Sequence, residues 1–419
     1  VPREWRGEHE GVPAVDREGV DLDVLRPVVH GPAGRGVGGA DGRGRGVLHA
    51  DAGFDWYVDE LKLSDAVRNA MLTSGVCIHL LENFSNDIKK LSGVVQYDDQ
   101  RSSIWVYDVL QAAEVNYIAG KDPCILPKAC KTPSEQLAIK QAHIRDGVAL
   151  VRFMYWLDAQ DLRDGHVTEL LVEEKLEDYR RADRTYRGPS FSTIAGWAEH
   201  GAIIHYRATP DSNAVLCGSG FLLLDSGGQY EYGTTDITRT IVIGEVTPEM
   251  KDRYTRVLKG HIALASARFA PETEGCALDN LARQPLIDEG LNFAHGTGHG
   301  VGCFLCVHEE ASSISPRGKD RLRAGMLVSN EPGYYKEGAY GIRHENLILC
   351  QEDSEEFYSF ETVTCVPFDL RGIDWDLMSE AEIMWLATYH RHVVDTLSPF
   401  LDEDELRWLH GAAFCDHIH

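Results

Sequence analysis

Two carboxylates at the ends of a candidate β-hairpin could hold a metal ion. The apolar run Phe221–Leu224 ends in Asp225, and the second strand of the hairpin begins at Asp236. A hairpin centred between Tyr230 and Glu231 would make the two aspartates cross-strand partners, with Cβ atoms about 4.5–5.5 Å apart on one face. Carboxylates held this close in an apolar setting repel each other unless a cation neutralises them. The spacing therefore predicts a divalent metal ion.

A second candidate hairpin repeats the arrangement. The segment Val328–Gly333 leads through a turn into Gly341–Asn346, and a turn centred on Gly338 places Glu331 opposite Glu345. The two hairpins together supply four acidic ligands, and two divalent cations balance their charge better than one does. We therefore expect two metal ions rather than one.

A glycine-rich loop adds histidines to these carboxylates. It runs from His295 to Gly302 and contains His299, and His308 follows shortly after it. Because glycine has no Cβ, a loop of this composition lets the backbone approach a ligand closely. A single Asp, Glu or His in a loop is more often a solvated or structural residue. Solvated turns do not, however, explain two acid-paired hairpins around a loop rich in glycine and histidine.

Taken together, these motifs resemble the pita-bread metallopeptidases, and among them the Xaa-Pro aminopeptidases. The matching segments are Leu224–Gly227, Gly233–Thr240, His295–Gly302, Ser329–Tyr335 and Gly341–Asn346. The similarity extends from about Val47 to the C-terminus. The resemblance implies an α+β fold, with a pita-bread catalytic domain preceded by a truncated, smaller α/β domain.

The resemblance also assigns roles to individual residues. The implied ligands of the dinuclear site are Asp225, Asp236, His299, Glu331 and Glu345. Asp236 and Glu345 would bridge the two ions, and Glu331 would also move the proton of the water between them. The implied substrate-side residues are His205, His295, His308 and Arg343. His295 and His308 would position the peptide and stabilise the developing oxyanion, and Arg343 would orient the acidic ligands.

The activity that the resemblance implies is that of a metallo-aminopeptidase. It would remove the first residue from peptides with proline at the second position, using a hydroxide activated by two divalent ions. Oxygen-rich ligation with one imidazole suits Mn²⁺, with Zn²⁺ or Co²⁺ as substitutes. The expected partners are peptide substrates, and the family suggests a homodimer.

Three alternatives remain at this point. A prolidase, which needs the free carboxylate of a dipeptide, shares the motifs, although the helical tail after Phe360 favours the aminopeptidase. A pita-bread binding protein without metals is disfavoured because all five implied ligands are present. A serine hydrolase is suggested only by the segment Asp225–Gly228, where Leu224 stands in place of an expected glycine.

Helices and strands alternate around the motif residues. Thr132–Glu135 forms a capping box that opens a helix to about Leu157. Further helices are predicted after Thr168, from Thr247 to about Phe269, from Ser379 to Leu397 and after Asp402. Strands are predicted at Ala202–Tyr206, Phe221–Asp225, Asp236–Ile243, Met326–Glu331 and Ile342–Cys350. Nearer the N-terminus we predict strands at Val47–Ala50, Phe54–Val58 and Ser103–Val106 and a helix at Leu63–Leu72, with a turn at Asp51–Gly53.

The 419 residues are enough for two or three domains. We expect an atypical Gly/Arg-rich segment at 1–46, a partial creatinase-like α/β domain at 47–128, a catalytic domain at 129–368 and a helical extension at 369–419. The first segment does not resemble the family, which suggests truncation or a frame error. Trp197–His200 also departs from the family, because it replaces a small Asn/Gly-rich loop expected near the pocket. His344 should point away from the metals by strand alternation.

Composition limits the range of partners. Lys and Arg total 41 against 66 Asp and Glu, so the formal charge is −25. A charge this negative argues against nucleic acid and anionic membranes as partners. No apolar run approaches the ~18 residues of a membrane helix, and no secretory signal is visible. The expected compartment is the cytoplasm, and ten scattered cysteines suit reduced thiols.

Overall fold

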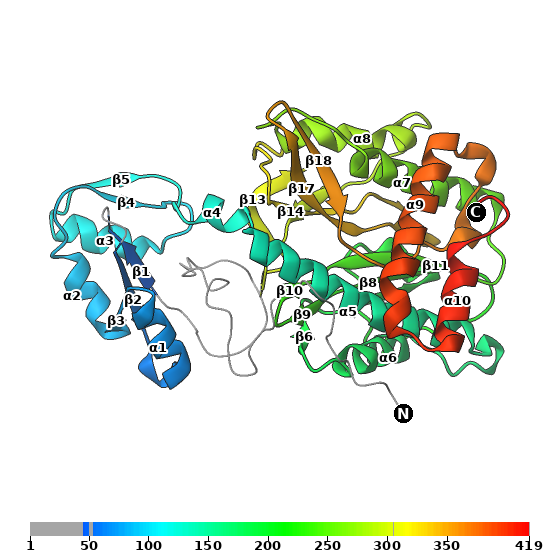
Figure 1. Cartoon of the computed structure of the whole chain (residues 1–419), viewed down its shortest axis with the longest axis horizontal. Coiled ribbons are helices and arrows are strands. Elements are labelled where there is room, and N and C mark those ends of the chain that lie inside the picture. Colours follow the sequence, from blue (N-terminus) through cyan, green and yellow to red (C-terminus); the bar gives the residue numbers. More distant parts are fainter. Residues whose placement is uncertain (1–44, 50–52, 305, 419) are drawn as a thin grey trace. The chain divides into compact units, whose positions relative to one another are not determined.

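The computed structural model describes residues 45–49, 53–304 and 306–418. The Gly/Arg-rich segment predicted at 1–46 lies outside this part of the chain except for its last two residues, and so does most of the turn predicted at Asp51–Gly53. The contacts divide the chain into two compact units that meet between Lys128 and Ala129 in the sequence (Figure 1). In the described part of the chain, no helix is both long and apolar enough to cross a membrane.

The first unit contains two small sheets and short helices. Its elements are β1 (Arg45–Leu48), β2 (Phe54–Val58), α1 (Asp65–Thr73), β3 (Val76–Leu80), α2 (Phe84–Ile88), β4 (Val95–Tyr97), α3 (Ile104–Ala112), β5 (Tyr117–Ala119) and α4 (Ile125–Ala129). Strand β2 pairs antiparallel with β1 and parallel with β3. The strand predicted at Ser103–Val106 is wrong, because Ser103 caps α3 by accepting a hydrogen bond from the Trp105 amide at 3.3 Å.

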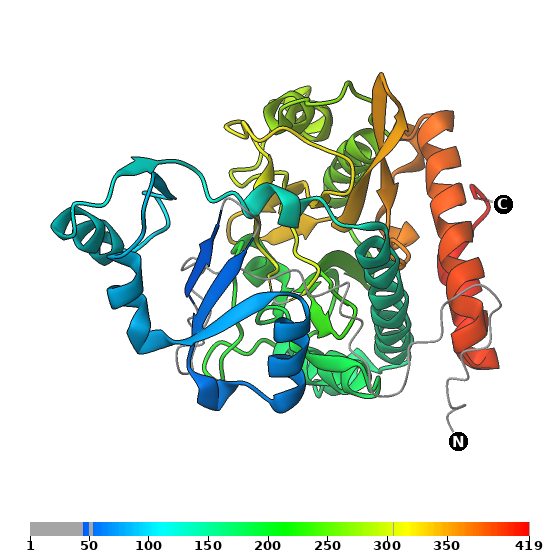
Figure 2. The same cartoon turned by 60° about the vertical axis from the view of Figure 1, so that its left-hand side comes forward.

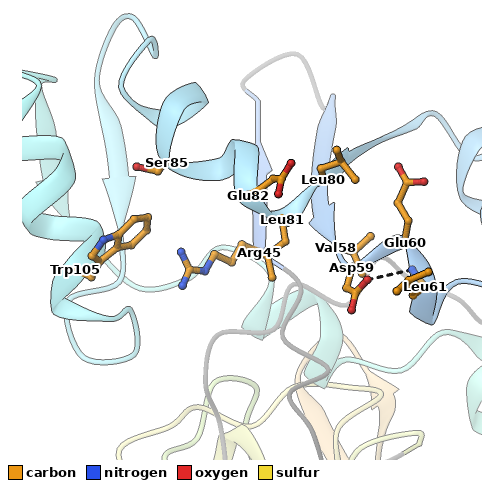
Figure 3. Close-up of a pocket in the computed structure, with 10 residues that line it drawn as sticks. All are labelled: Arg45, Val58, Asp59, Glu60, Leu61, Leu80, Leu81, Glu82, Ser85 and Trp105. Carbon is orange, nitrogen blue, oxygen red and sulfur yellow. Dashed lines mark hydrogen bonds between the residues drawn. The ribbon is translucent and has the colours of Figure 1, made fainter.

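A pocket of about 730 Å³ lies in this first unit (Figure 3). Arg45 and Trp105 lie along one part of it, and Leu61 and Leu80 along another. Asp59 accepts a hydrogen bond from the Leu61 amide there. None of the residues predicted for the metal site lines this pocket.

The described residues of the second unit form six longer helices. They are α5 (Pro133–Asp158), α6 (Glu169–Arg181), α7 (Pro248–Ala265), α8 (Gly275–Ile287), α9 (Glu380–Leu397) and α10 (Glu403–Ala413). The predicted capping box at Thr132 and Glu135 is confirmed, with both reciprocal hydrogen bonds present. Helix α7 ends at Ala265, earlier than predicted. Helix α8 was not predicted: Glu274 makes no side-chain cap, and Pro285 lies inside the helix.

The strands described in this unit form four sheets. One sheet has the order β11 (Ile237–Ile243), β8 (Gly220–Ser226), β7 (Ile194–Trp197), and a second β10 (Gly233–Thr234), β9 (Gly228–Tyr230), β6 (Tyr186–Pro189). The third has the order β13 (Glu309–Ile314), β12 (Gly298–Gly300), β14 (Leu327–Asn330), β17 (Asn346–Ser354), β18 (Phe357–Thr362). The fourth pairs β15 (Gly333–Lys336) with β16 (Tyr340–Arg343).

Two predicted strands differ from the structure. The segment Ala202–Tyr206 is not a strand, since a 3₁₀ turn at Ala198–Ala202 leads into a loop. The single strand predicted at Ile342–Cys350 is two strands, β16 and β17. The chain leaves the β15–β16 sheet after Arg343, and the Glu345 amide donates to the Thr238 carbonyl of β11 at 3.1 Å. This change of partner brings Glu345 to the strand that follows Asp236.

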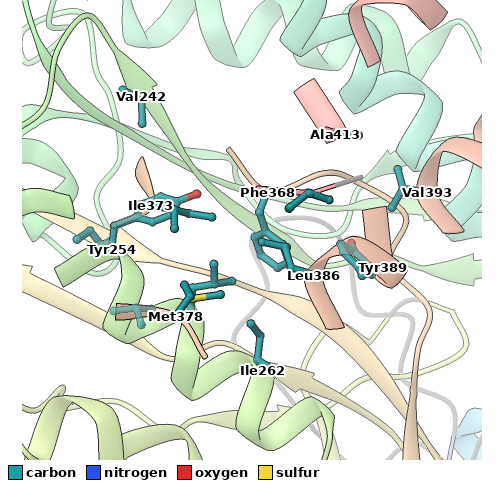
Figure 4. Packing of buried hydrophobic residues seen from close by; sticks show 14 of the residues in the cluster. Val242, Tyr254, Ile262, Phe368, Ile373, Met378, Leu386, Tyr389, Val393 and Ala413 are labelled. Carbon is teal, nitrogen blue, oxygen red and sulfur yellow. The ribbon is translucent and has the colours of Figure 1, made fainter. Parts of the chain in front are cut away.

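Apolar side chains from α7, from α9 and from the segment 365–378 form one large core (Figure 4). Tyr254 and Ile262 from α7 pack with Phe368, and with Leu386 and Val393 from α9. Helices α9 and α10 lie side by side in both views (Figures 1 and 2). The C-terminal helices are therefore part of the same core as the strands that carry the predicted ligands.

Candidate metal centre

The first acidic hairpin has a register shifted from the predicted one. Asp225 on β8 pairs with Thr238 on β11, and Tyr230 pairs with Gly233, so the turn is centred one residue later than predicted. Asp236 is therefore not the direct partner of Asp225, and that prediction is wrong. Because residues two apart along an extended chain face the same side, Asp236 is a diagonal neighbour on the same face.

The second acidic hairpin has the predicted register. Gly333 pairs with Arg343 on one side of the acidic residues, and Asn330 pairs with Asn346 on the other side. Both pairs fit a turn centred on Gly338, so Glu331 and Glu345 lie opposite each other between them. The two hairpins are joined where the Glu345 amide donates to the Thr238 carbonyl.

Three of the predicted ligands form a tight group. One potential ligand atom from each of Asp236, His299 and Glu345 lies within 4.8 Å of the others. His299 Nε2 is 3.5 Å from Asp236 Oδ2 and 3.4 Å from Glu331 Oε1. Asp225 is held beside the group by Arg343, and its Oδ1 is buried without a hydrogen-bond partner among the residues that the structure describes. This arrangement offers buried oxygen and imidazole ligands to a cation.

The clustered carboxylates repel each other, and a cation would stabilise them. Burial and then the Asp225 charge raise the pKa of Asp236 to about 6, and burial with the neighbouring carboxylates raises the pKa of Glu331 to about 7. Burial followed by the charges of Asp236 and Glu331 also raises the pKa of Glu345. Burial opposes protonation of His299, but hydrogen bonding to Asp236 and the Glu331 charge raise its pKa to about 9. Metal ions would remove this mutual repulsion, so the residues fit a divalent site.

Arg343 connects this group to a tyrosine. Its guanidinium donates to Asp225 Oδ2 at 2.6 Å, to Thr238 Oγ1 at 3.1 Å and to the Tyr335 hydroxyl at 2.8 Å. The side chain is 2% exposed. Because all three contacts are made by one planar group, Arg343 fixes Asp225 relative to both hairpins.

The predicted substrate-side histidines lie around the acidic group. His295 Nε2 is 2.8 Å from the Tyr335 hydroxyl, and Nδ1 is 2.7 Å from the Gly296 carbonyl. The His308 ring packs edge-on against His299, with centroids 4.4 Å apart. Burial, with a neighbouring cation, lowers the pKa of His295 to about 3 and that of His308 to about 4. Both are therefore neutral at pH 7. His205 is exposed and lies within electrostatic reach of both.

Sequence reasoning missed three residues that hold the predicted metal ligands or substrate-side residues by hydrogen bonds. The Thr238 hydroxyl donates to Glu345 Oε2 at 2.7 Å, and the Ser329 hydroxyl donates to Glu331 Oε1 at 3.0 Å. The third is Tyr335, described above. Thr238 is two residues from Asp236 and Ser329 is two residues from Glu331, so strand alternation could have identified both.

His344 lies in the core, as strand alternation predicts. Its ring packs against Tyr254, with centroids 4.2 Å apart, and against Phe368. On the same side, the buried Arg239 donates to the Glu345 backbone carbonyl at 2.7 Å and to the Asn346 side chain at 2.8 Å. These contacts fix the backbone that presents Glu345.

Comparison with known families agrees with this geometry. Residues 138–352, more than half of the chain, match the model of metallopeptidase family M24. The chain belongs to metallopeptidase family M24. Residues 45–135 match the creatinase/prolidase N-terminal domain, and residues 356–413 match the C-terminal region of M24 peptidases. The expected fold, a pita-bread catalytic domain preceded by a smaller α/β domain, is confirmed.

Relatives of this M24 peptidase include proline-specific peptidases. It is 37% identical to Aminopeptidase P1 of Arabidopsis thaliana, over 87% of this chain and 65% of the relative. It is also 37% identical to Xaa-Pro aminopeptidase 1 of Dictyostelium discoideum, over 84% of this chain and 58% of the relative. The chain thus spans less than two thirds of the length of these relatives.

Two solved structures place the fold among enzymes of this kind. The X-prolyl aminopeptidase of Caenorhabditis elegans, a cytosolic enzyme with a di-nuclear active site, superposes with a TM-score of 0.80 at 31% identity. That match covers 86% of this chain and 62% of the other. An Xaa-Pro dipeptidase from Bacillus anthracis superposes with a TM-score of 0.65 at 26% identity, covering 80% of this chain and 89% of the other.

Proposed function

We propose that this M24 peptidase is a metal-dependent Xaa-Pro aminopeptidase that removes the first residue from peptides with proline in second place. The observation that carries the proposal is the close group of the buried Asp236 and Glu345 with the half-buried His299. The similarity to aminopeptidases P over most of the chain supports the substrate class. The proposed ligands of two divalent ions are Asp225, Asp236, His299, Glu331 and Glu345.

When bound, two divalent ions lower the pKa of a water molecule and polarise the scissile carbonyl. Within the protein, Glu331 is the group suited to hold a proton during the reaction. A carboxylate next to a metal-activated water can accept the proton of that water and release it again. The Ser329 hydroxyl orients its carboxylate by donating to Oε1.

The histidines would act on the peptide. His308 is neutral and exposed beside His299, so its ring can donate a hydrogen bond to a developing oxyanion. His295 is also neutral and is held in place by Tyr335 and Gly296. With His205, these side chains would position the peptide. Arg343 would hold Asp225 in place by donating to its Oδ2.

We also propose the metal, the compartment, the assembly and the domain boundaries of the enzyme. We propose Mn²⁺ as the preferred metal, with Zn²⁺ or Co²⁺ as substitutes, because oxygen ligands outnumber imidazole. The cytoplasm as compartment and a homodimer as the assembly are proposed from the family. The four proposed segments are 1–46, 47–128, 129–368 and 369–419; the compact units and the family matches support the boundary near residue 129.

The test is a comparison of the tripeptide Arg-Pro-Pro with the dipeptide Arg-Pro. The purified protein is assayed before and after EDTA treatment, and again after Mn²⁺ is restored. Release of arginine from the tripeptide, lost with EDTA and regained with Mn²⁺, is the expected result. Preference for the dipeptide would instead assign the protein as a prolidase, the class of the B. anthracis relative.

A further inference from the structure

The loop that departs from the family pattern at Trp197–His200 is attached to one buried carboxylate. Glu169, at the start of α6, is 0% exposed. Its Oε1 accepts hydrogen bonds from the Trp197 amide and from His200 Nδ1, both at 2.8 Å. Its Oε2 accepts from the Tyr206 hydroxyl at 2.8 Å and from the Ala214 amide at 2.9 Å. We call these five residues the Glu169 cluster.

The Glu169 cluster fixes both ends and the middle of one loop. Trp197 ends β7, Ala214 precedes β8, and His200 and Tyr206 lie between them. The rings of His200 and Tyr206 stack with centroids 4.4 Å apart. The Glu169 amide also donates to the Ala214 carbonyl at 3.1 Å, so α6 holds the loop through backbone and side chain together.

The same loop packs directly on the strand that carries Arg343. A Cβ built on Gly341 in β16 would lie 1.7 Å from the Gly201 carbonyl oxygen, which shows how closely the two backbones approach. Ala198 has a φ of 49°, a left-handed conformation that is strained for a non-glycine residue. A strained residue of this kind persists only where surrounding contacts determine it, and the Glu169 cluster supplies them.

His205 precedes Tyr206, so the Glu169 cluster controls where this histidine lies. Tyr206 is buried: its hydroxyl donates to Glu169 and its ring packs with Ile194 and Leu223. His205, in contrast, is exposed. His205 lies within electrostatic reach of His295 and His308. A shift of Tyr206 would therefore move His205 relative to the other substrate-side histidines.

We propose that Glu169 is a positioning residue that sets the position of His205 relative to His295 and His308 through His200 and Tyr206. This inference rests on the proposed function, because His205 is assigned there to substrate binding. Glu169 itself touches no substrate in this scheme. Four donors on one buried carboxylate, rather than any single contact, give the loop its fixed position.

The test compares Glu169→Gln with Glu177→Gln. Glu177 lies on the same helix and also accepts from a tyrosine hydroxyl, that of Tyr186 at 2.6 Å, but it does not contact the loop. We expect Glu169→Gln to lower kcat/KM for Arg-Pro-Pro on the order of ten- to a hundredfold, as misplacement of a positioning group does. Bound metal should stay unchanged. The Glu177 variant should keep wild-type kinetics.

A double-mutant cycle with His205→Ala separates positioning from general structure. If Glu169 acts through His205, adding Glu169→Gln to His205→Ala should cost less than about threefold further. Full additivity of the two losses, or a loss of metal in Glu169→Gln, would overturn the proposal. Tyr206→Phe removes one donor and keeps the ring, so it provides the same test with little risk to folding.

Hydrogen exchange measured by mass spectrometry gives a readout that does not depend on activity. In Glu169→Gln and Tyr206→Phe, amides between residues 198 and 214 should exchange faster, while those of α5 keep wild-type rates. Unchanged exchange in the loop would refute the proposal even if the kinetics change. If wild-type protein cleaves neither peptide, the proposed function fails, and the exchange result still decides whether Glu169 holds the loop.

Discussion

His308 is placed to act on substrate without holding a metal. Its ring packs edge-on against His299 and keeps part of its surface exposed. Partial desolvation on the protein side, together with the His299 charge, lowers its pKa to about 4. Replacing it by phenylalanine keeps a ring of similar size and removes a neutral hydrogen-bond donor. We expect His308→Phe to lower kcat on the order of 10²–10³-fold, the usual cost of one oxyanion donor.

Metal analysis of the same variant provides the control. His308→Phe should bind as much metal as the wild type, because the acidic group and His299 are intact. His166→Phe, at an exposed position remote from these residues in the sequence, should have wild-type kcat. An unchanged kcat in His308→Phe would show that His308 does not act on the reacting peptide.

Much of the arrangement of the site residues could be predicted from residue types and spacing. The Glu331–Glu345 pairing followed from a turn centred on Gly338, and both flanking pairs agree with it. The predicted pairing of Asp225 with Asp236 was wrong, because a shift of one residue in the turn centre changes the partner of every residue in the hairpin. Both aspartates nevertheless share a face, since the resulting shift between partners is an even number of residues.

Strand β16 and the loop at Gly201 approach each other so closely that we expect their contact to tolerate no added side-chain volume. In Gly341→Ala, the new methyl group would meet the Gly201 carbonyl oxygen at 1.7 Å, so one backbone must move. We expect a loss of about 1–3 kcal/mol in the free energy of unfolding, the range for overpacked sites. Urea unfolding with wild type and variant in parallel measures the loss.

Gly411→Ala is the matched control for this prediction. Gly411 lies in α10, where an added Cβ meets nothing within 4 Å. Replacing a helical glycine by alanine should stabilise the protein by about 1 kcal/mol. Equal effects of the two substitutions would contradict the close packing of the loop on β16.

Local sequence signals located most helices but misassigned two strands. Ile104–Val106 has the composition of a strand, yet Ser103 caps a helix there. The apolar run Ala202–Tyr206 was expected to be a strand, but Tyr206 is held by Glu169, which is 37 residues away in the sequence. A contact over that distance leaves no periodic pattern in the loop itself, so propensity alone could not reveal it.

For the whole molecule, the buried histidine that joins α9 to α10 predicts a dependence of stability on pH. His390 Nδ1 donates to the Ala413 carbonyl at 2.8 Å, and Nε2 accepts from the Phe368 amide at 3.0 Å. Burial lowers its pKa from 6.5 to about 4, although the hydrogen bond to Ala413 opposes this. Below pH 6.5 the unfolded chain binds a proton that the folded protein does not bind until about pH 4.

Stability should therefore fall as pH falls through this window, by up to about 1.4 kcal/mol per pH unit for this group. His390→Gln keeps one hydrogen bond to the backbone and removes the titration. Urea unfolding of metal-free wild type and variant at pH 7, 6 and 5 should show a shallower decline in the variant. Parallel declines would mean that His390 is protonated in the folded protein as easily as in the unfolded chain.

We propose that this M24 peptidase works with two metal ions held by two acidic hairpins and His299. The most direct measurement is a titration of metal-free protein with Mn²⁺, following bound metal by equilibrium dialysis and arginine release from Arg-Pro-Pro in the same samples. We predict two bound ions per chain and no activity without metal. Binding of no metal, saturation at one ion, or arginine release that persists in metal-free protein would contradict the claim.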